Sequence, residues 1–226
     1  SVSGAFEHGF FRGHGVATTS FIATAGRGRD RVVRLETAWT IDRPDSLSTL
    51  RVGDSLSVAG PGAVPYRFAG VHYARNYAVQ PGFITMPLPT LSGSTEVPSV
   101  VDVYVNNVLQ GSQELGPGPF DINDIPVQSG GGKVQLVVQD LLGRQVVTEA
   151  AYYATTSLLR KGLHDFSYEI GFLRNDFGFA SNDYDELVAS TAHRYGFTDS
   201  LTGEAQLQLS EGRQMASLGF QLIAEV

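Results

Sequence analysis

The stretch Phe166-Ser-Tyr-Glu-Ile-Gly-Phe172 alternates, residue by residue, between apolar side chains and polar or small ones. Successive side chains of a β-strand point to opposite faces, so this period of two predicts a strand with one apolar and one mixed face. The same alternation recurs over residues 33–39, 204–209 and 216–222. Helical periodicity is almost absent, and the chain is therefore predicted to be all-β.

Short segments rich in Gly, Asp, Ser and Pro interrupt these strands after about ten residues each. They lie at residues 26–30, 42–45, 198–200 and 210–212. Strands and turns at this spacing are typical of β-sandwiches, of soluble barrels and of outer-membrane barrels. The pattern alone leaves these three architectures open.

The composition of the 226 residues narrows the classes of function. Sixteen Lys and Arg against 23 Asp and Glu give a formal net charge of −7, which disfavours a protein that neutralises nucleic-acid phosphates. The chain has no cysteine, so it has no disulfide framework, thiolate nucleophile or Cys-ligated zinc site. No stretch approaches the ~20 apolar residues of a membrane-spanning helix, but the short strands of a transmembrane barrel escape that test.

The composition changes in the middle of the chain. Residues 86–98 contain three prolines and several small polar residues, and we expect an extended linker there rather than a strand. A short β-branched strand follows at 101–105, and Asn106-Asn107 is a candidate hairpin turn. The segment from about 99 to 148 thus resembles a small β-sandwich inserted between longer strands. With Glu149 at its edge, its charge is −4, from the six acids Asp102, Glu114, Asp121, Asp124, Asp140 and Glu149 against Lys133 and Arg144.

No stretch of the sequence matches the pattern of a catalytic, phosphate-binding or metal-binding motif. The five His residues are scattered, and the run Gly130-Gly-Gly-Lys133 lacks the Ser or Thr that a phosphate loop places after its lysine. The run 53–57 fails the nucleophile-elbow pattern at its last position. The acids at 183, 185 and 186 fit a solvated turn better than a calcium loop. We therefore expect no enzymatic activity, no cofactor and no metal site.

Two features fit a plain soluble sandwich poorly. Aromatic residues lie in pairs near predicted strand ends, as in the girdles of outer-membrane barrels, although the β-propensity of aromatics explains them equally well. These pairs are Tyr73 and Tyr77, Tyr152 and Tyr153, and Tyr195 and Phe197. Charged residues also lie on the polar face of long strands, where they would line the wet lumen of a barrel or the solvent side of a sandwich. They are Arg34, Glu36, Arg67, Glu169 and Arg194.

Several stretches, in this order, resemble fimbrial (pilus) outer-membrane ushers of the chaperone–usher pathway. The strongest are Val103-Tyr-Val-Asn-Asn-Val-Leu-Gln-Gly111 and Gly116-Pro-Gly-Pro-Phe-Asp-Ile-Asn-Asp-Ile-Pro126, followed by Lys133-Val-Gln-Leu-Val-Val-Gln-Asp140 and Leu142-Gly-Arg-Gln-Val146. Residues 66–71, 75–78 and 86–93 are similar to the barrel strands that lead into the usher plug. Residues 158–162 and 166–171 look like the return into the barrel.

The resemblance implies part of a large transmembrane antiparallel β-barrel with an inserted small β-sandwich plug domain. Residues 1–98 would be barrel strands and the Pro-rich linker, residues 99–150 the plug, and residues 151–226 the barrel strands that follow it. Some ten strands cannot close a barrel of about two dozen, so we expect a piece of a longer chain.

The implied function is a secretion pore and assembly platform in the bacterial cell outer membrane, with a plug that gates the channel. Its partners would be periplasmic chaperone–pilin subunit complexes, pilin subunits and outer-membrane lipid, with no nucleic acid and no small-molecule substrate. Assembly would proceed by donor-strand exchange, driven by pilin folding without a nucleotide or other cofactor.

The resemblance also suggests which residues act in gating. The plug candidates are Gly116, Pro117, Gly118, Pro119, Phe120, Asp121, Ile122, Asn123 and Asp124. The Gly-Pro-Gly-Pro run is either a stiff turn or a direct contact for pilin. Because the plug is acidic, we expect charge pairs with lumen arginines such as Arg67 or Arg194.

Two other interpretations compete with an usher. One is a soluble secreted two-domain β-sandwich adhesin or binding module, which would need no detergent. The other is an ordinary porin or receptor barrel, against which the sandwich-like insert counts.

Overall fold

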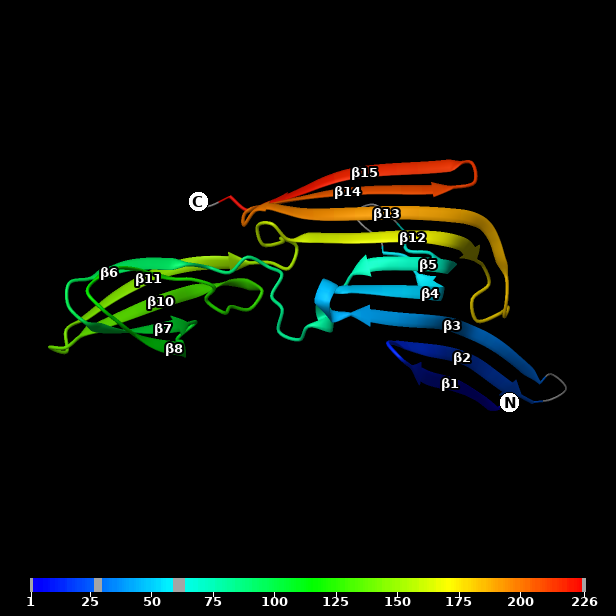
Figure 1. Cartoon of the computed structure of the whole chain (residues 1–226), viewed down its shortest axis with the longest axis horizontal. Helices are drawn as coiled ribbons and strands as arrows, with labels where there is room; N and C mark the ends of the chain where they lie inside the picture. The colour runs from blue at the N-terminus through cyan, green and yellow to red at the C-terminus, as the bar shows by residue number, and fades with distance from the viewer. Residues whose placement is uncertain (1, 27–29, 59–63, 225–226) are drawn as a thin grey trace. The chain divides into compact units, whose positions relative to one another are not determined.

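The computed structural model describes residues 2–26, 30–58 and 64–224, and Figure 1 traces these segments. Their regular structure consists of β-strands and two short 3-10 helices, η1 (Pro44–Ser46) and η2 (Tyr77–Val79). The all-β prediction is therefore confirmed. None of the helices among these residues has the length and apolar character needed to cross a membrane. The turn predicted at 26–30 falls mostly on residues outside the described ranges.

Nine strands form one sheet in the order β1-β2-β3-β4-β5-β12-β13-β14-β15. Their bounds are β1 (Val2–Arg12), β2 (Gly15–Ala25), β3 (Arg31–Arg43), β4 (Ser48–Leu56), β5 (Arg67–Arg75), β12 (His164–Arg174), β13 (Tyr184–Thr198), β14 (Leu201–Ser210) and β15 (Arg213–Leu222). Neighbouring strands of the sheet are also consecutive along the chain, except that β5 pairs with β12. The predicted strand at 166–172 lies within β12, and the turns predicted at 198–200 and 210–212 join β13 to β14 and β14 to β15.

The two faces of this sheet are inverted relative to a soluble protein. On β12, Tyr168, Ile170 and Phe172 are 44%, 53% and 53% exposed, whereas Ser167 and Glu169 are buried. Val71 of β5 and Val52 of β4, which are aligned with Ile170, are also exposed, at 41% and 46%. We call the face with Ser167 and Glu169 the polar face, and the opposite one the apolar face. Burial of polar groups behind an exposed apolar surface is the arrangement of strands that face lipid.

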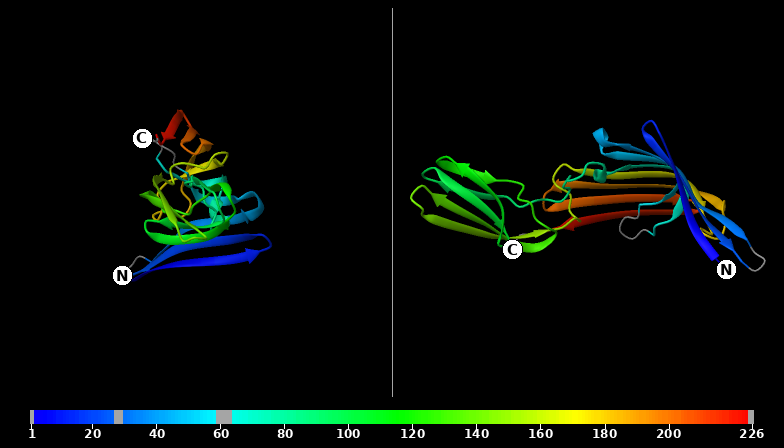
Figure 2. Two further views of the ribbon diagram at one scale, coloured as in Figure 1. Left: turned by 90° about the vertical axis from the view of Figure 1, so that its left-hand side faces the viewer. Right: turned by 90° about the horizontal axis from the view of Figure 1, so that it is seen from below.

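The sheet is strongly twisted. In the right-hand view of Figure 2, the blue strands β1 and β2 cross the direction of the orange and red strands β13 to β15. Adjacent strands rotate in one sense because of the chirality of L-residues, and the rotation accumulates over nine strands. Such a sheet curls instead of lying flat.

The join between β5 and β12 depends on two glycines that face each other. Ser167 to Leu173 of β12 pair with Ala74 to Phe68 of β5, and Gly171 lies opposite Gly70. A Cβ on Gly70 would lie 2.0 Å from the carbonyl oxygen of Ile170, and one on Gly171 would lie 2.3 Å from that of Ala69. The backbones therefore come too close here for any larger residue.

The chain leaves the sheet where β5 ends and returns where β12 begins. We call the strand ends on this side of the sheet the insert end, and the opposite strand ends the far end. The insert contains two further sheets, one with the order β11-β10-β7-β8 and one that pairs β6 with β9. The strands are β6 (Leu91–Thr95), β7 (Ser99–Val105), β8 (Val108–Leu115), β9 (Gly118–Ile122), β10 (Gly130–Asp140) and β11 (Gln145–Ala154).

A hydrophobic core joins the two sheets of the insert. Its buried members are Val101, Val103, Val105, Ile125, Val134 and Leu136. Leu91 of β6 and Phe120 of β9 pack against this core, so the short ribbon covers the four-stranded sheet. The insert is therefore the small β-sandwich that the sequence predicts.

One local prediction holds and one is wrong. Asn106 and Asn107 both adopt positive φ angles (48° and 68°) in the tight turn between β7 and β8, as a two-residue hairpin requires. Residues 86–98 are not a strand-free linker, because β6 lies within them and pairs with β9. Prolines flank β6 at 89 and 98 but do not enter it, so its amide groups remain available for pairing.

The described chain forms two compact units. The first contains residues 1–83, 164–195 and 203–220, which are most of the nine-stranded sheet. The second contains residues 84–163, 196–202 and 221–226, which are the insert with its two linkers and the turn between β13 and β14.

The variant Gly171→Ala should lower the free energy of unfolding by about 1–3 kcal/mol, because its Cβ would collide with the backbone of β5. The matched control is Gly9→Ala in β1, where the nearest atom to a new Cβ is 4.0 Å away. Thermal unfolding of both variants checks this. Equal unfolding midpoints for the two variants would contradict the close approach of the β5 and β12 backbones at Gly70 and Gly171.

Candidate functional site

The predicted plug candidates fall in and around β9. Side chains of this strand alternate, so that Phe120 and Ile122 point to the core of the insert and Asp121 is exposed. Phe120 packs against Gly93 of β6, where a Cβ would lie 2.4 Å from the ring. Gly118 has a φ of +128°, which L-residues rarely adopt. The structure therefore assigns Phe120 and Ile122 to the core, and it leaves the carboxylate of Asp121 exposed.

The remaining candidates lie on either side of β9. Gly116 and Pro117 form the exposed connection from β8, and the carbonyl of Gly116 accepts a hydrogen bond from the hydroxyl of Thr95 at 3.0 Å. Asn123 and Asp124 follow β9 and are exposed. The Asp124 carboxylate forms an ion pair with Arg160 on the returning linker.

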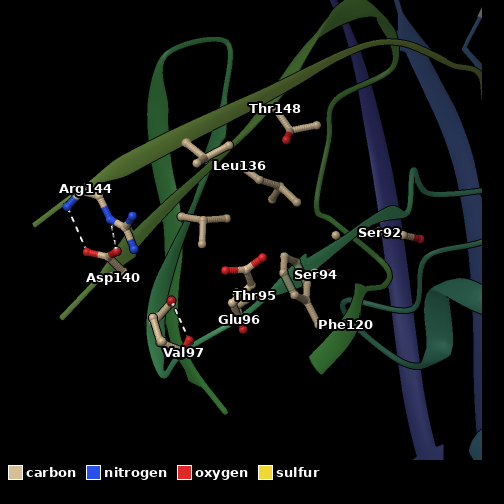
Figure 3. Close-up of a pocket in the computed structure, with 14 residues that line it drawn as sticks. Ser92, Ser94, Thr95, Glu96, Val97, Phe120, Leu136, Asp140, Arg144 and Thr148 are labelled. Carbon is tan, nitrogen blue, oxygen red and sulfur yellow. Dashed lines mark hydrogen bonds and ion pairs between the residues drawn. The ribbon is translucent and has the colours of Figure 1, made fainter. Parts of the chain in front are cut away.

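A pocket of about 360 Å³ lies between the two sheets of the insert. Figure 3 shows Phe120 on one side of this space and the ion pair of Asp140 with Arg144 on the other. Leu136 and Val138 of β10 contribute apolar surface. Apart from this ion pair, the polar part of the lining consists of hydroxyl side chains and the carboxylate of Glu96.

The Asp140 side chain closes the turn between β10 and β11. It accepts hydrogen bonds from the backbone amides of Leu142 and Arg144, both at 2.9 Å, and from the Arg144 guanidinium at 2.7 Å. Desolvation alone would raise the pKa of Asp140, but these hydrogen bonds together hold its pKa below the ordinary value. The carboxylate thus stays ionised and keeps the turn in place.

The two linkers of the insert are fastened to each other and to the turn between β13 and β14. The amide of Arg160 donates to the carbonyl of Thr85 at 2.8 Å, which joins the returning linker to the outgoing one. The amide of buried Leu159 donates to the hydroxyl of Thr202 at 2.8 Å, and the backbone amide of Lys161 donates to the Asp199 carboxylate at 2.9 Å. These bonds make a defined base from which the sandwich of the insert extends.

The polar face of the large sheet contains a buried charge network centred on Asp54. Its carboxylate accepts hydrogen bonds from the Tyr184 hydroxyl at 2.6 Å, from the Arg174 guanidinium at 2.9 Å and from the amide of Thr37 at 2.8 Å. Arg34 forms a further ion pair with the same carboxylate. The side chains of Arg174 and Asp54 are 1% and 5% exposed, so this pair is shielded from solvent.

The same network binds the loop 175–183 between β12 and β13. The carbonyl of Ser181 accepts hydrogen bonds from Arg34 at 2.9 Å and from Arg174 at 3.2 Å. The Asn182 side chain accepts another from Arg34 at 3.1 Å. Because β3 lies three strands away from β12, the loop must cross β5 and β4 to reach Arg34. It forms a strap across the polar face.

A second, more open cluster lies beside the strap. Glu36 forms ion pairs with Arg51 at 3.2 Å and with Arg67 at 2.6 Å. The guanidinium of Arg67 stacks 3.6 Å from the centre of the Phe177 ring, which belongs to the strap. The strap is therefore held by charges near its end and by this cation–π contact near its beginning.

A third cluster surrounds Glu169. This carboxylate accepts hydrogen bonds from Ser167 at 3.1 Å, from Ser190 at 2.5 Å and from the amide of Val58 at 2.7 Å. It is 1% exposed at its side chain and lies 3.8 Å from the imidazole of His72. The satisfied carboxylate ties the segment after β4 to the polar face.

Of the five predicted lumen charges, the structure brings Arg34, Glu36 and Arg67 to the strap, and it places Glu169 and Arg194 elsewhere. Arg194 lies 3.6 Å from Asp165 and 3.7 Å from Glu204. Both arginines expected to bind the plug, Arg67 and Arg194, thus have acidic neighbours within the sheet itself.

Sequence reasoning missed Asp54, Arg174 and Tyr184. Strict alternation along β12 would place Arg174 on the apolar face with Phe172, but the register shifts between these two residues. Such a bulge turns the following side chain onto the other face. The sequence signal was an isolated arginine after an alternating apolar strand, a position where lipid would not accept a charge.

The sequence also matches the model of a known protein family. Residues 36–223 match the family model described as "Outer membrane usher protein".

The chain belongs to the outer membrane usher family. Among curated ushers, FimC of Bordetella pertussis is 26% identical over 200 residues, which are 87% of this chain and 22% of FimC. FaeD of Escherichia coli is 29% identical over 213 residues, which are 92% of this chain and 24% of FaeD. The chain thus spans about a fifth of the length of the curated ushers it matches.

The fold agrees with this assignment. In a solved Escherichia coli P pilus tip assembly intermediate, PapC-PapD-PapK-PapG, a chain that is 14% identical superposes with a TM-score of 0.58, over 92% of this chain and 26% of that one. The predicted fold class is confirmed: the chain is all-β, with strands of the usher's transmembrane barrel and an inserted small β-sandwich. As a family member, it is localised to the bacterial outer membrane.

Loss of a carboxylate from the buried Asp54 network of this usher segment should lower the unfolding free energy far more than loss of one from the open Glu36 cluster. Asp54→Ala leaves Arg174 buried without its partner, and should cost about 3–5 kcal/mol of unfolding free energy. Glu36→Ala removes a carboxylate that is 33% exposed, and should cost about 0–1 kcal/mol. Unfolding in detergent micelles measures both. Equal losses would contradict a larger stabilising contribution from the buried Asp54 network than from the open Glu36 cluster.

Proposed function

We propose that this chain is the part of a fimbrial usher that supplies barrel strands on either side of the plug, together with the plug that gates the channel. Residues 1–98 and 151–226 are assigned to the wall and the linker, and residues 99–150 to the plug. The pairing of β6 with β9 adds residues 91–95 to the plug side.

The inverted sheet is the observation that carries this proposal. The apolar face exposes aliphatic and aromatic side chains of β4, β5 and β12, as a surface against lipid does. The polar face bears Asp54, Glu169 and their arginine and hydroxyl partners, which suits the wet lumen of a wide channel. A soluble adhesin would instead bury its apolar side chains and is not favoured.

The linkers support gating by movement of the plug as one body. The sandwich has its own hydrophobic core, and its linkers are bonded to each other at Thr85 and Arg160. A domain with its own core can leave the channel without unfolding. The Asp124–Arg160 ion pair between β9 and the returning linker would then restrain this movement.

The proposed partners follow from the family. Periplasmic chaperones would deliver pilin subunits, and donor-strand exchange between subunits would supply the energy of assembly. The usher segment would provide a passage and a gate without catalysing a chemical reaction, without a cofactor, and with contact to outer-membrane lipid. The gating residues would be those of 116–124, with Asp121 as the exposed carboxylate of β9.

Reversing the charge of the plug face should open the channel. In the usher that carries this segment, reconstituted into planar bilayers, D121K/D124K should raise the resting conductance. It reverses the charge of Asp121, which we propose to pair with a lumen arginine, and it breaks the ion pair of Asp124 with Arg160 on the returning linker. The matched control is E96K/E114K, which makes the same charge change at two other exposed positions of the insert. Unchanged conductance of D121K/D124K, or an equal rise in the control, would overturn the gating role.

A further inference from the structure

The apolar face of the sheet changes character in steps toward the insert end. Its middle row consists of the aligned residues Val52, Val71 and Ile170. One step closer to the insert end, Tyr73 lies opposite Tyr168. Leu50 of β4 is aligned with the same pair, so this row combines an aliphatic side chain with two tyrosines. Tyrosines are common where barrel strands leave the hydrocarbon layer.

The next row is cationic. Arg43 of β3 and Arg75 of β5 both pair in register with Ser48 of β4, so they flank this small buried residue. Since neighbouring strands lie about 4.8 Å apart, their backbones are roughly 10 Å apart, and two arginine side chains can converge over that distance. Among the described residues, no acidic side chain forms an ion pair with either arginine.

Aromatic rings and carbonyl groups hold these arginines in place. The Arg75 guanidinium stacks 5.1 Å from the centre of the Phe166 ring and donates to the carbonyls of Ser46 at 2.6 Å and His164 at 3.1 Å. Arg43 is exposed and lies 6.0 Å from the centre of the Tyr73 ring. The cations are therefore positioned on the apolar face by its aromatic residues.

Two histidines extend the row on β12 and β13. Nε2 of His164 and Nδ1 of His193 are 2.9 Å apart and hydrogen-bonded. A neutral pair uses one N–H in this bond and leaves one N–H for an outside acceptor. Alternation places the nearby acids Asp42 and Asp165 on the opposite face, and Asp45 lies in η1, outside the row. Asp165 is close enough to interact electrostatically with Arg75 and His164, but it forms its ion pair with Arg194, at 3.6 Å. The row therefore offers positive charge and N–H donors.

The connections indicate which leaflet this row meets. At the insert end the turns 13–14, 44–47 and 199–200 contain two to four residues. At the far end the connections 26–30, 57–66 and 175–183 contain five, ten and nine residues, and only 211–212 is short. Outer-membrane barrels have short turns on the periplasmic side and longer loops outside. The insert end is therefore the periplasmic end.

We propose that Arg43 and Arg75 bind the phosphate of an anionic phospholipid in the periplasmic leaflet, and that the imidazoles of His164 and His193, which follow on β12 and β13, offer an N–H to the same layer of headgroups. This inference rests on the proposed role of the sheet as barrel wall. A cation without a carboxylate partner at the rim of a lipid-facing surface has the headgroup phosphate as its natural counter-charge. The bound lipid would fix the depth of the wall at the end where the linkers of the plug leave it.

The test compares lipid binding by the usher that carries this segment and by the variant R43Q/R75Q. The probe is short-chain phosphatidylglycerol, with short-chain phosphatidylcholine and inorganic phosphate as separate arms. Unsubstituted protein should prefer phosphatidylglycerol, and the variant should lose roughly fivefold in affinity for each arginine removed, which corresponds to about 1 kcal/mol each. The control R31Q/R213Q removes two exposed arginines at the far end and should bind as the unsubstituted protein does.

Equal affinity of R43Q/R75Q and the unsubstituted protein would overturn the site, and so would an equal loss in the far-end control. Binding of inorganic phosphate as tight as that of phosphatidylglycerol would replace a lipid site by a phosphate site and also overturn it. If R43Q/R75Q does not fold, R43Q alone decides, since Arg43 is the exposed member of the pair. Flotation with vesicles separates the two proposals, because protein that inserts without lipid preference contradicts only this site, whereas failure to insert contradicts the proposed function.

Discussion

The ladder between β5 and β12 is the interaction on which the large sheet depends, because it joins strands separated by an insert of 88 residues. It requires Gly70 and Gly171 to face each other without a Cβ on either side. Only when β12 lies beside β5 can the strap that follows it cross two strands and reach Arg34. The charge network around Asp54 therefore depends on the pairing of β5 with β12.

The inverted faces explain why this sheet is stabilised differently from a soluble one. In lipid, every backbone amide and carbonyl needs a partner within the sheet, so long uninterrupted ladders are required. Behind them, the polar face gains cohesion from charges and hydrogen bonds, as around Asp54 and Glu169. Low exposure strengthens these contacts but also makes each unpaired member costly. The hydrophobic packing that stabilises a typical domain is found in the insert, around Val101 and Leu136.

Local patterns in the sequence predicted what local physics decides. The alternation at 166–172 and the Asn106-Asn107 turn needed only side-chain geometry and positive φ angles, and both were correct. β6 was missed because its prolines suggested a linker, whereas its strand character comes from pairing with β9, which is distant in sequence. The Asp54 network was missed for the same reason: Arg34 and Ser181 meet only through tertiary structure, and a register shift moves Arg174 to the face that alternation would deny it.

Because the insert leaves and re-enters between two neighbouring strands, the wall does not need it for continuity. The pairs from Ser167 with Ala74 to Leu173 with Phe68 form the same ladder as a plain hairpin would. The large sheet and the insert can therefore diverge in evolution under separate constraints. A designer could likewise graft a foreign domain between residues 83 and 164 and keep the ladder between β5 and β12.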